Sequence, residues 1–211
     1  SGESFGINVR HGGTGSISVN ATDVTRARES GVYAYGTSLV TSGASVTTMG
    51  TVTGYVNGIE ARLLGAGDLT VNAVNASADL YAGVRTLQGA STAGRTRVTT
   101  SGDVSGGQWG IFSRNDGTGG AEIAVSGAVT SIDTGIRVYA HGSNQISIAG
   151  GGSVTGGGHA IFTSGTTDRN SDDSVMKAGR VRGLVDLGGG TNAFNNSTGG
   201  VVSTVGAVMV V

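Results

Sequence analysis

Apolar side chains return along this chain at a nearly fixed interval, and each return opens with a small residue followed by Ile or Val. Successive openings are 25 to 27 residues apart, which suits one supersecondary unit stacked many times. The openings are Gly6-Ile7, Gly31-Val32, Gly58-Ile59, Gly83-Val84, Gly110-Ile111 and Gly135-Ile136, and the seventh, Ala160-Ile161, has alanine in place of glycine. The pattern predicts a repeat protein rather than a globule with one central core.

Each interval contains three short groups in which apolar and polar residues alternate, and this period of two indicates strands with one inward face. The first group begins at the Ile or Val of the opening. The second group comprises Ile17/Val19, Val46, Leu69/Val71, Thr96/Val98, Ile123/Val125 and Ile146/Ile148. The third group is centred on Val24, Val52, Val104, Val129 and Val154. Three strands and three turns in each unit of 25–27 residues predict an all-β chain folded as a right-handed parallel β-helix, with coils about 4.8 Å apart.

The repeat divides the chain into three parts. Residues 1–165 are expected to form the regular coils, and residues 166–178, which include a polar run, are expected to be an excursion or a mobile loop. Residues 179–211 resume the alternation and are expected to form shorter terminal coils. Because the chain starts without an initiator Met and ends on bare valines, we expect it to be a piece of a longer protein.

The composition agrees with a stack of short strands. The chain has 41 glycines and no proline, so turns are frequent and no strand residue lacks a backbone N–H. The absence of cysteine excludes a disulfide framework and thiolate metal sites, and the absence of proline excludes collagen. A net charge of −1 gives no reason to expect nucleic acid as a partner, and no run of about 18 apolar residues offers a membrane-spanning segment.

The residue types that carry catalysis or metal binding do not cluster in this sequence. Glycine-rich segments at 12–15 and 117–120 are interpreted as turns, since a phosphate-binding loop needs a helix after it. Ser105 lies in a segment similar to a serine-protease nucleophile motif, but it occupies the place that threonine holds in other repeats. The three histidines are far apart and the acids are scattered. We therefore predict no catalytic residue, no metal site and no cofactor.

One predicted surface stands out when the outward positions of the first group are compared between repeats. The residues that follow each Ile or Val are Asn8, Tyr33, Glu60, Arg85, Phe112, Arg137 and Phe162, and those two places further on are Arg10, Tyr35, Arg62, Leu87, Arg114, Tyr139 and Ser164. Nine of these are singled out as candidate ligand-binding residues and are called the Arg/aromatic stripe: Tyr33, Tyr35, Arg62, Arg85, Phe112, Arg114, Arg137, Tyr139 and Phe162. Arginine beside aromatic rings suits glycan stacking and protein hot spots. The alternative is that the same side chains only stabilise the ladder.

The motifs of the repeat resemble those of a known family. The recurring Gly-Ile openings, the strands Ser-Ile-Ser-Val and Glu-Ile-Ala-Val, the Gly-x-Val-Thr returns and the segment 185–196, Val-Asp-Leu-Gly-Gly-Gly-Thr-Asn-Ala-Phe-Asn-Asn, are similar to those of bacterial autotransporter passenger domains. The resemblance covers nearly all of the chain. It implies a β-helical rod that is exported across the outer membrane by a C-terminal β-barrel of the parent protein and is then displayed or released at the cell surface.

These observations lead to one functional expectation and two alternatives. We expect a non-enzymatic stalk or adhesin segment at the bacterial cell surface, monomeric or weakly self-associating, that contacts a host-cell, matrix or glycan ligand along the Arg/aromatic stripe. A rigid rod would hold several weak contacts in register, so that an extended ligand engages many coils together. The first alternative is a polysaccharide lyase or depolymerase of the same architecture. The second is a purely structural spacer without a ligand.

Overall fold

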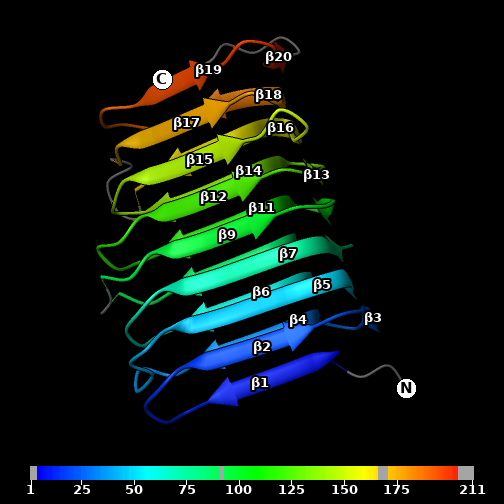
Figure 1. Ribbon diagram of the computed structural model, residues 1–211, viewed down its shortest axis with the longest axis vertical. Helices are drawn as coiled ribbons and strands as arrows, with labels where there is room; N and C mark the ends of the chain where they lie inside the picture. The colour runs from blue at the N-terminus through cyan, green and yellow to red at the C-terminus, as the bar shows by residue number, and fades with distance from the viewer. Residues whose placement is uncertain (1–3, 91–92, 166–170, 204–211) are drawn as a thin grey trace.

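The computed structural model describes residues 4–90, 93–165 and 171–203, and it shows a parallel β-solenoid of about 8 turns (Figure 1). The described residues contain strands and no helix, and every pairing between described strands is parallel. The β-helix architecture expected from the repeat is therefore confirmed. No helix in this part of the chain has the length and apolar character needed to cross a membrane.

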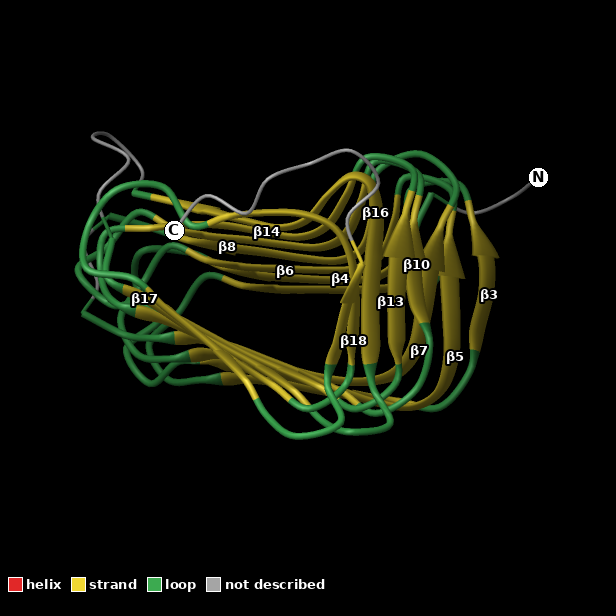
Figure 2. Ribbon diagram, turned by 90° about the horizontal axis from the view of Figure 1, so that it is seen from above, coloured by secondary structure: helices red, strands yellow, loops and turns green. Residues whose placement is uncertain are grey.

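Seen along the stack, the strands form three walls (Figure 2). The first wall contains β1 (Ile7–His11), β4 (Ser30–Gly36), β6 (Asn57–Leu63), β8 (Ala82–Gln88), β11 (Trp109–Asn115), β14 (Thr134–Ala140) and the later parts of β16 (Ser153–Ser164) and β18 (Arg180–Asp186). The second wall contains β2 (Ile17–Ala21), the first parts of β5 (Ala44–Gly54) and β7 (Leu69–Ala78), then β9 (Thr96–Thr100), β12 (Ala121–Val125), β15 (Asn144–Ile148), β17 (Asp173–Lys177) and β19 (Ala193–Asn196). The third wall contains β3 (Val24–Ala27), the later parts of β5 and β7, β10 (Val104–Gly106), β13 (Ala128–Ser131), the first parts of β16 and β18, and β20 (Val201–Ser203). Each coil thus contributes one strand segment to each wall.

The repeated apolar residues stack on one another in register. In the first wall the aligned residues are Ile7, Val32, Ile59, Val84, Ile111, Ile136, Ile161 and Val185. In the third wall they are Val24, Val52, Ala76, Val104, Val129, Val154, Val181 and Val202. The columns predicted for these two groups are confirmed, and most of their members are fully buried. The core is a pile of thin Ile/Val layers, so each coil removes apolar surface from water on its neighbours.

The second wall departs from the sequence alignment at one point. Val46 pairs with Val19, as predicted, but Val98 pairs with Ile123 rather than with Val125. The alignment of Thr96/Val98 with Ile123/Val125 is therefore wrong by one inward position. The reason is that an inward position can be polar: the buried Thr96 hydroxyl donates to Gln88 Oε1 at 2.8 Å, so an apolar side chain is not needed there.

The glycine of each opening is explained by two close neighbours. A Cβ added at Gly110 would lie 2.5 Å from Val129 Cγ1 and 2.7 Å from the carbonyl oxygen of Gly135 in the next coil. Equivalent approaches occur at Gly31 and Gly135, so the same rule holds along the stack. Glycine is thus required because the third-wall valine and the next coil's backbone fill the space that a side chain would take. The seventh opening has Ala160 in place of glycine. The next coil does not follow the regular spacing there, because the pairing of β16 with β18 shifts register on either side of His159.

The end of the stack differs from the three parts expected from the sequence. Residues 166–170 lie outside the described residues, whereas 173–177 form β17, which pairs with β15. This portion of the predicted excursion therefore belongs to the stack and is not a loop. The shorter terminal coils are seen: Arg180 pairs with Val201, 21 residues later, compared with the 25 to 27 residues of the regular openings. The apolar residues 208–211 also lie outside the described residues.

The core becomes polar in the same region. Asp173 and Lys177, on the inward side of β17, are 3% and 1% exposed. Asp173 accepts hydrogen bonds from Thr163 Oγ1, from Ser171 Oγ at 3.1 Å and from Asn144 Nδ2 at 2.7 Å. Burial raises the pKa of Asp173, and these donors oppose the rise. The buried carboxyl is thus held by three donors from neighbouring parts of the stack.

Candidate functional site

All nine residues of the Arg/aromatic stripe lie on the first wall and form two neighbouring columns. One column aligns Tyr33, Glu60, Arg85, Phe112, Arg137 and Phe162, and the other aligns Tyr35, Arg62, Leu87, Arg114 and Tyr139. The register that the sequence predicted for these positions is present. Most of the side chains are partly exposed, whereas Phe112 is buried at 8% exposure. The stripe is therefore a real surface feature, and its two halves differ in chemistry.

The half nearer the N-terminus is centred on a buried carboxylate. Glu60 is only 5% exposed, and its Oε1 accepts hydrogen bonds from Arg62 Nε at 2.6 Å and from Arg85 Nη1 at 3.1 Å. Its other oxygen accepts from Ser30 Oγ at 3.1 Å and from Asn57 Nδ2 at 2.9 Å. Two of the stripe's arginines are thus already paired inside the protein, so here the stripe mainly stabilises the ladder.

Tyr33 and Tyr35 lie beside this network. Their rings are stacked with centroids 6.4 Å apart and planes at 8°, and the Arg10 guanidinium lies 5.4 Å from the Tyr33 centroid. Burial raises the pKa of Tyr33, with a further rise from the Glu60 charge, while the charges of Arg62 and Arg10 oppose it. The phenol is therefore uncharged at neutral pH and available as a flat apolar surface with a polar edge.

The half nearer the C-terminus is a continuous row of rings. Centroid distances are 4.6 Å for Trp109–Phe112, 6.0 Å for Phe112–Tyr139 and 6.0 Å for Tyr139–Phe162. These spacings lie in the range in which aromatic side chains attract one another. The rings cross three coils, so the row runs along the axis of the rod.

Arg137 lies at the centre of this row. Its guanidinium carbon is 5.8 Å from the Trp109 centroid, 5.1 Å from that of Tyr139 and 4.9 Å from that of Phe162. Its Nε and Nη2 both donate to Tyr139 Oη, the first at 2.8 Å. Within the described ranges Arg137 forms no ion pair with a carboxylate. We call Trp109, Phe112, Arg137, Tyr139 and Phe162 the ring cluster, a fixed cation set among aromatic faces.

Sequence reasoning missed three members of this surface. Trp109 lies two residues before Ile111 in β11, where strict alternation predicts an inward side chain, yet its ring contacts those of Phe112 and Tyr81. His159 occupies the aligned place in β16, and its ring is 5.4 Å from that of Phe162. Tyr81 stacks on Trp109 at 6.0 Å. Alternation alone would not have found Trp109 or His159, because each lies two residues before an inward Ile and therefore has the parity of an inward position, and Tyr81 lies in a turn that no periodicity marks.

The structure also places the other residues that the sequence singled out. Ser105 aligns with Ser77 and with Thr130, so it is one of a column of hydroxyls on the third wall. Arg114, the most exposed arginine of the stripe, pairs with Asp116 at 2.7 Å. In the part of the chain that the structure describes, no three His, Cys, Asp or Glu side chains lie close enough to share a metal ion.

Comparison with known proteins adds no identification: no family model matches the chain, and no curated protein or solved structure is similar enough to match it.

Proposed function

We propose that this chain is a non-enzymatic stalk or adhesin segment of an autotransporter-like bacterial surface protein, and that it contacts a host-cell, matrix or glycan ligand through the ring cluster. The observation that carries the proposal is the row of rings along the rod with Arg137 at its centre. The family assignment is supported by the resemblance of the repeat motifs and by the solenoid architecture.

The proposal narrows the ligand surface to one half of the stripe. Around Glu60 the arginines use their donors within the protein, so a ligand there would have to compete with a buried carboxylate. In the ring cluster, the strands hold partly exposed ring faces and a cation that has no carboxylate partner among the described residues. Rigid aromatic anchors lose little conformational entropy on binding, which favours weak contacts repeated along an extended ligand.

A binding experiment tests the ring cluster. Immobilised matrix proteins and an array of glycans would be probed with the wild-type chain and with the double variant Arg137→Gln/Tyr139→Ala. We expect at least a tenfold loss of binding, because the variant removes both the cation and a central ring. Arg182→Gln, which removes an exposed arginine from the third wall, is the matched control and should bind as the wild type does.

The alternatives give different results in the same experiment. A double variant that keeps its circular dichroism spectrum and its full adhesion would favour a structural spacer. Release of oligosaccharides from a polysaccharide, abolished by Asp103→Asn or Asp133→Asn, would favour a lyase or depolymerase. The autotransporter assignment has its own test, which is to sequence the parent gene beyond Val211 and look for the alternating strands of a membrane barrel.

A further inference from the structure

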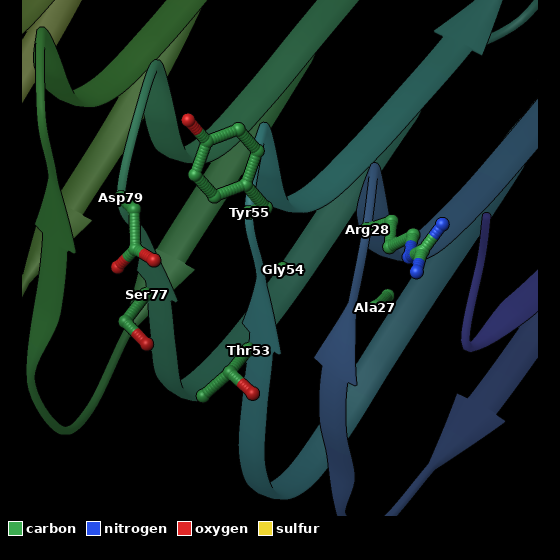
Figure 3. A pocket seen from close by; sticks show the side chains of 7 residues that line it. All are labelled: Ala27, Arg28, Thr53, Gly54, Tyr55, Ser77 and Asp79. Atoms are coloured by element: carbon green, nitrogen blue, oxygen red, sulfur yellow. The ribbon is translucent and has the colours of Figure 1, made fainter. Parts of the chain in front are cut away.

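A groove lies on the outer side of the third wall, where the wall turns toward the first (Figure 3). Its volume is about 690 Å³, and its lining includes Arg28, Thr53, Tyr55, Ser77 and Asp79. Thr53 and Ser77 point outward from β5 and β7, and the other three follow directly after β3, β5 and β7. The groove is on a different wall from the ring cluster, and the proposed adhesive function does not use it.

The solenoid register places a cation, a ring and an anion in sequence along this groove. Ala27 aligns with Gly54, and Gly54 aligns with Ala78. The residues that follow, Arg28, Tyr55 and Asp79, therefore occupy the same turn position in three successive coils. With about 4.8 Å between coils, the two charges lie about 10 Å apart along the axis. Figure 3 shows the Tyr55 ring between them.

The charges in the groove are not used by the fold. Arg28 and Asp79 are exposed, and neither belongs to an ion pair formed within the described residues. At a separation of two coils they cannot pair directly with each other. Tyr55 is 54% exposed, so a large part of its ring is accessible to a ligand. The groove therefore presents opposite charges on either side of an accessible aromatic face.

The backbone argues against a peptide as the occupant. β5 lies between β3 and β7, so its backbone groups are taken up by the ladders on both sides. A peptide placed here could not add to the sheet as a strand, so the backbone ladder that gives affinity at a sheet edge is missing. A sugar has hydroxyl groups that can donate to Thr53 Oγ1, which itself donates to the Val24 carbonyl oxygen at 3.4 Å, and that suit the Ser77 hydroxyl. Its ring face suits Tyr55.

We propose that the groove binds an oligosaccharide that carries both carboxylate and ammonium groups, with the carboxylate at Arg28, a sugar ring on Tyr55 and the ammonium at Asp79. The Arg28 guanidinium donates hydrogen bonds to the carboxylate, and the Asp79 carboxylate accepts them from the ammonium. A ligand of one charge sign satisfies one end of the groove and meets a like charge at the other. The selectivity thus comes from the order of charges that the register imposes.

Three oligosaccharides of matched length test this selectivity near pH 6 by calorimetry: carboxymethyl-chitosan (both charges), chitosan (ammonium only) and oligogalacturonate (carboxylate only). We expect the first to bind at least tenfold more tightly than either of the others. Arg28→Gln should reduce its affinity to that of chitosan, and Asp79→Asn should reduce it to that of oligogalacturonate. The double exchange Arg28→Asp/Asp79→Arg should restore the preference, with the ligand reversed.

Two controls keep the outcome specific to the groove. Ile132 occupies the same turn position in a later coil and is exposed, so Ile132→Ala should leave the affinity unchanged. The double variant Arg137→Gln/Tyr139→Ala in the ring cluster should also leave it unchanged, which separates this proposal from the adhesive one. Equal affinity for the three oligosaccharides, or an unchanged affinity after Arg28→Gln in a folded variant, would overturn the proposal.

Discussion

The Glu60 network offers a direct test of whether half of the Arg/aromatic stripe is structural. Glu60→Gln keeps the size of the side chain but replaces one oxygen by an NH₂ group and removes the negative charge. All four contacts of the carboxylate are donors: Ser30, Asn57, Arg62 and Arg85. If the amide NH₂ group is turned toward Arg62 and Arg85, it cannot accept their hydrogen bonds. If it is turned toward Ser30 and Asn57, it loses the bond from Asn57 Nδ2, whereas the Ser30 hydroxyl can accept instead of donating. In either orientation the variant loses the charge that pairs with both arginines and at least one hydrogen bond in a buried site.

The fall in the free energy of unfolding depends on how exposed the partners of Glu60 are. A hydrogen bond to a charged group contributes about 1.5–3 kcal/mol when it is buried. The side chains of Arg62 and Arg85 are 35% and 27% exposed, so water can replace part of what they lose. We expect the free energy of unfolding to fall by about 2–3 kcal/mol, from at least one lost buried hydrogen bond and the weakened bonds of two partly exposed arginines.

Urea unfolding followed by far-UV circular dichroism measures this effect. With a slope of about 2 kcal/mol per molar urea, the midpoint should fall by about 1 M or slightly more. Asp116→Asn is the matched control, because it breaks the Arg114–Asp116 pair, whose side chains are 50% and 32% exposed. That change should cost less than about 0.5 kcal/mol. If Glu60→Gln unfolds at the same urea concentration as Asp116→Asn, the view that Glu60 organises this half of the stripe is refuted.

Two further predictions concern the stack itself. Gly110→Ala places a methyl group against Val129 and the next coil's carbonyl and should destabilise the fold by about 2–3 kcal/mol, whereas Gly150→Ala, with no atom within 4 Å of the added Cβ, should be nearly neutral. Thermal unfolding of both variants checks this, and equal melting temperatures would contradict it. Because the pKa of Asp173 is raised in the folded chain, its stabilising contribution is present below the unfolded pKa and is lost as pH rises through the folded value. Asp173→Asn should therefore gain stability relative to the wild type as pH rises from about 4, near the unfolded pKa, through the raised folded pKa, and a difference in melting temperature that does not vary with pH would be inconsistent with this.

An alignment of the repeats predicts the positions of the Arg/aromatic stripe but not the groove. The two columns of the stripe follow from counting outward positions after each opening, because side chains alternate strictly along a strand. The pairing of Glu60 with Arg62 and Arg85 could not be counted in this way, since it depends on rotamers and on burial. The groove could not be predicted from the repeat pattern, because Arg28, Tyr55 and Asp79 lie in turns and are three different residue types.

The sequence by itself determined the architecture, because a stacked coil repeats one steric rule. Most opening glycines leave room for a third-wall valine and for backbone of the next coil, and each Ile or Val fills a thin layer of core, so residue types at a fixed spacing specify the coil. Only the tertiary structure decided which polar residues turn inward, as Thr96 and Asp173 do, and which charges are already satisfied. Those outcomes depend on hydrogen-bond partners from other walls and other coils, as Gln88 is for Thr96 and Asn144 is for Asp173, and the alternation along one strand does not specify them.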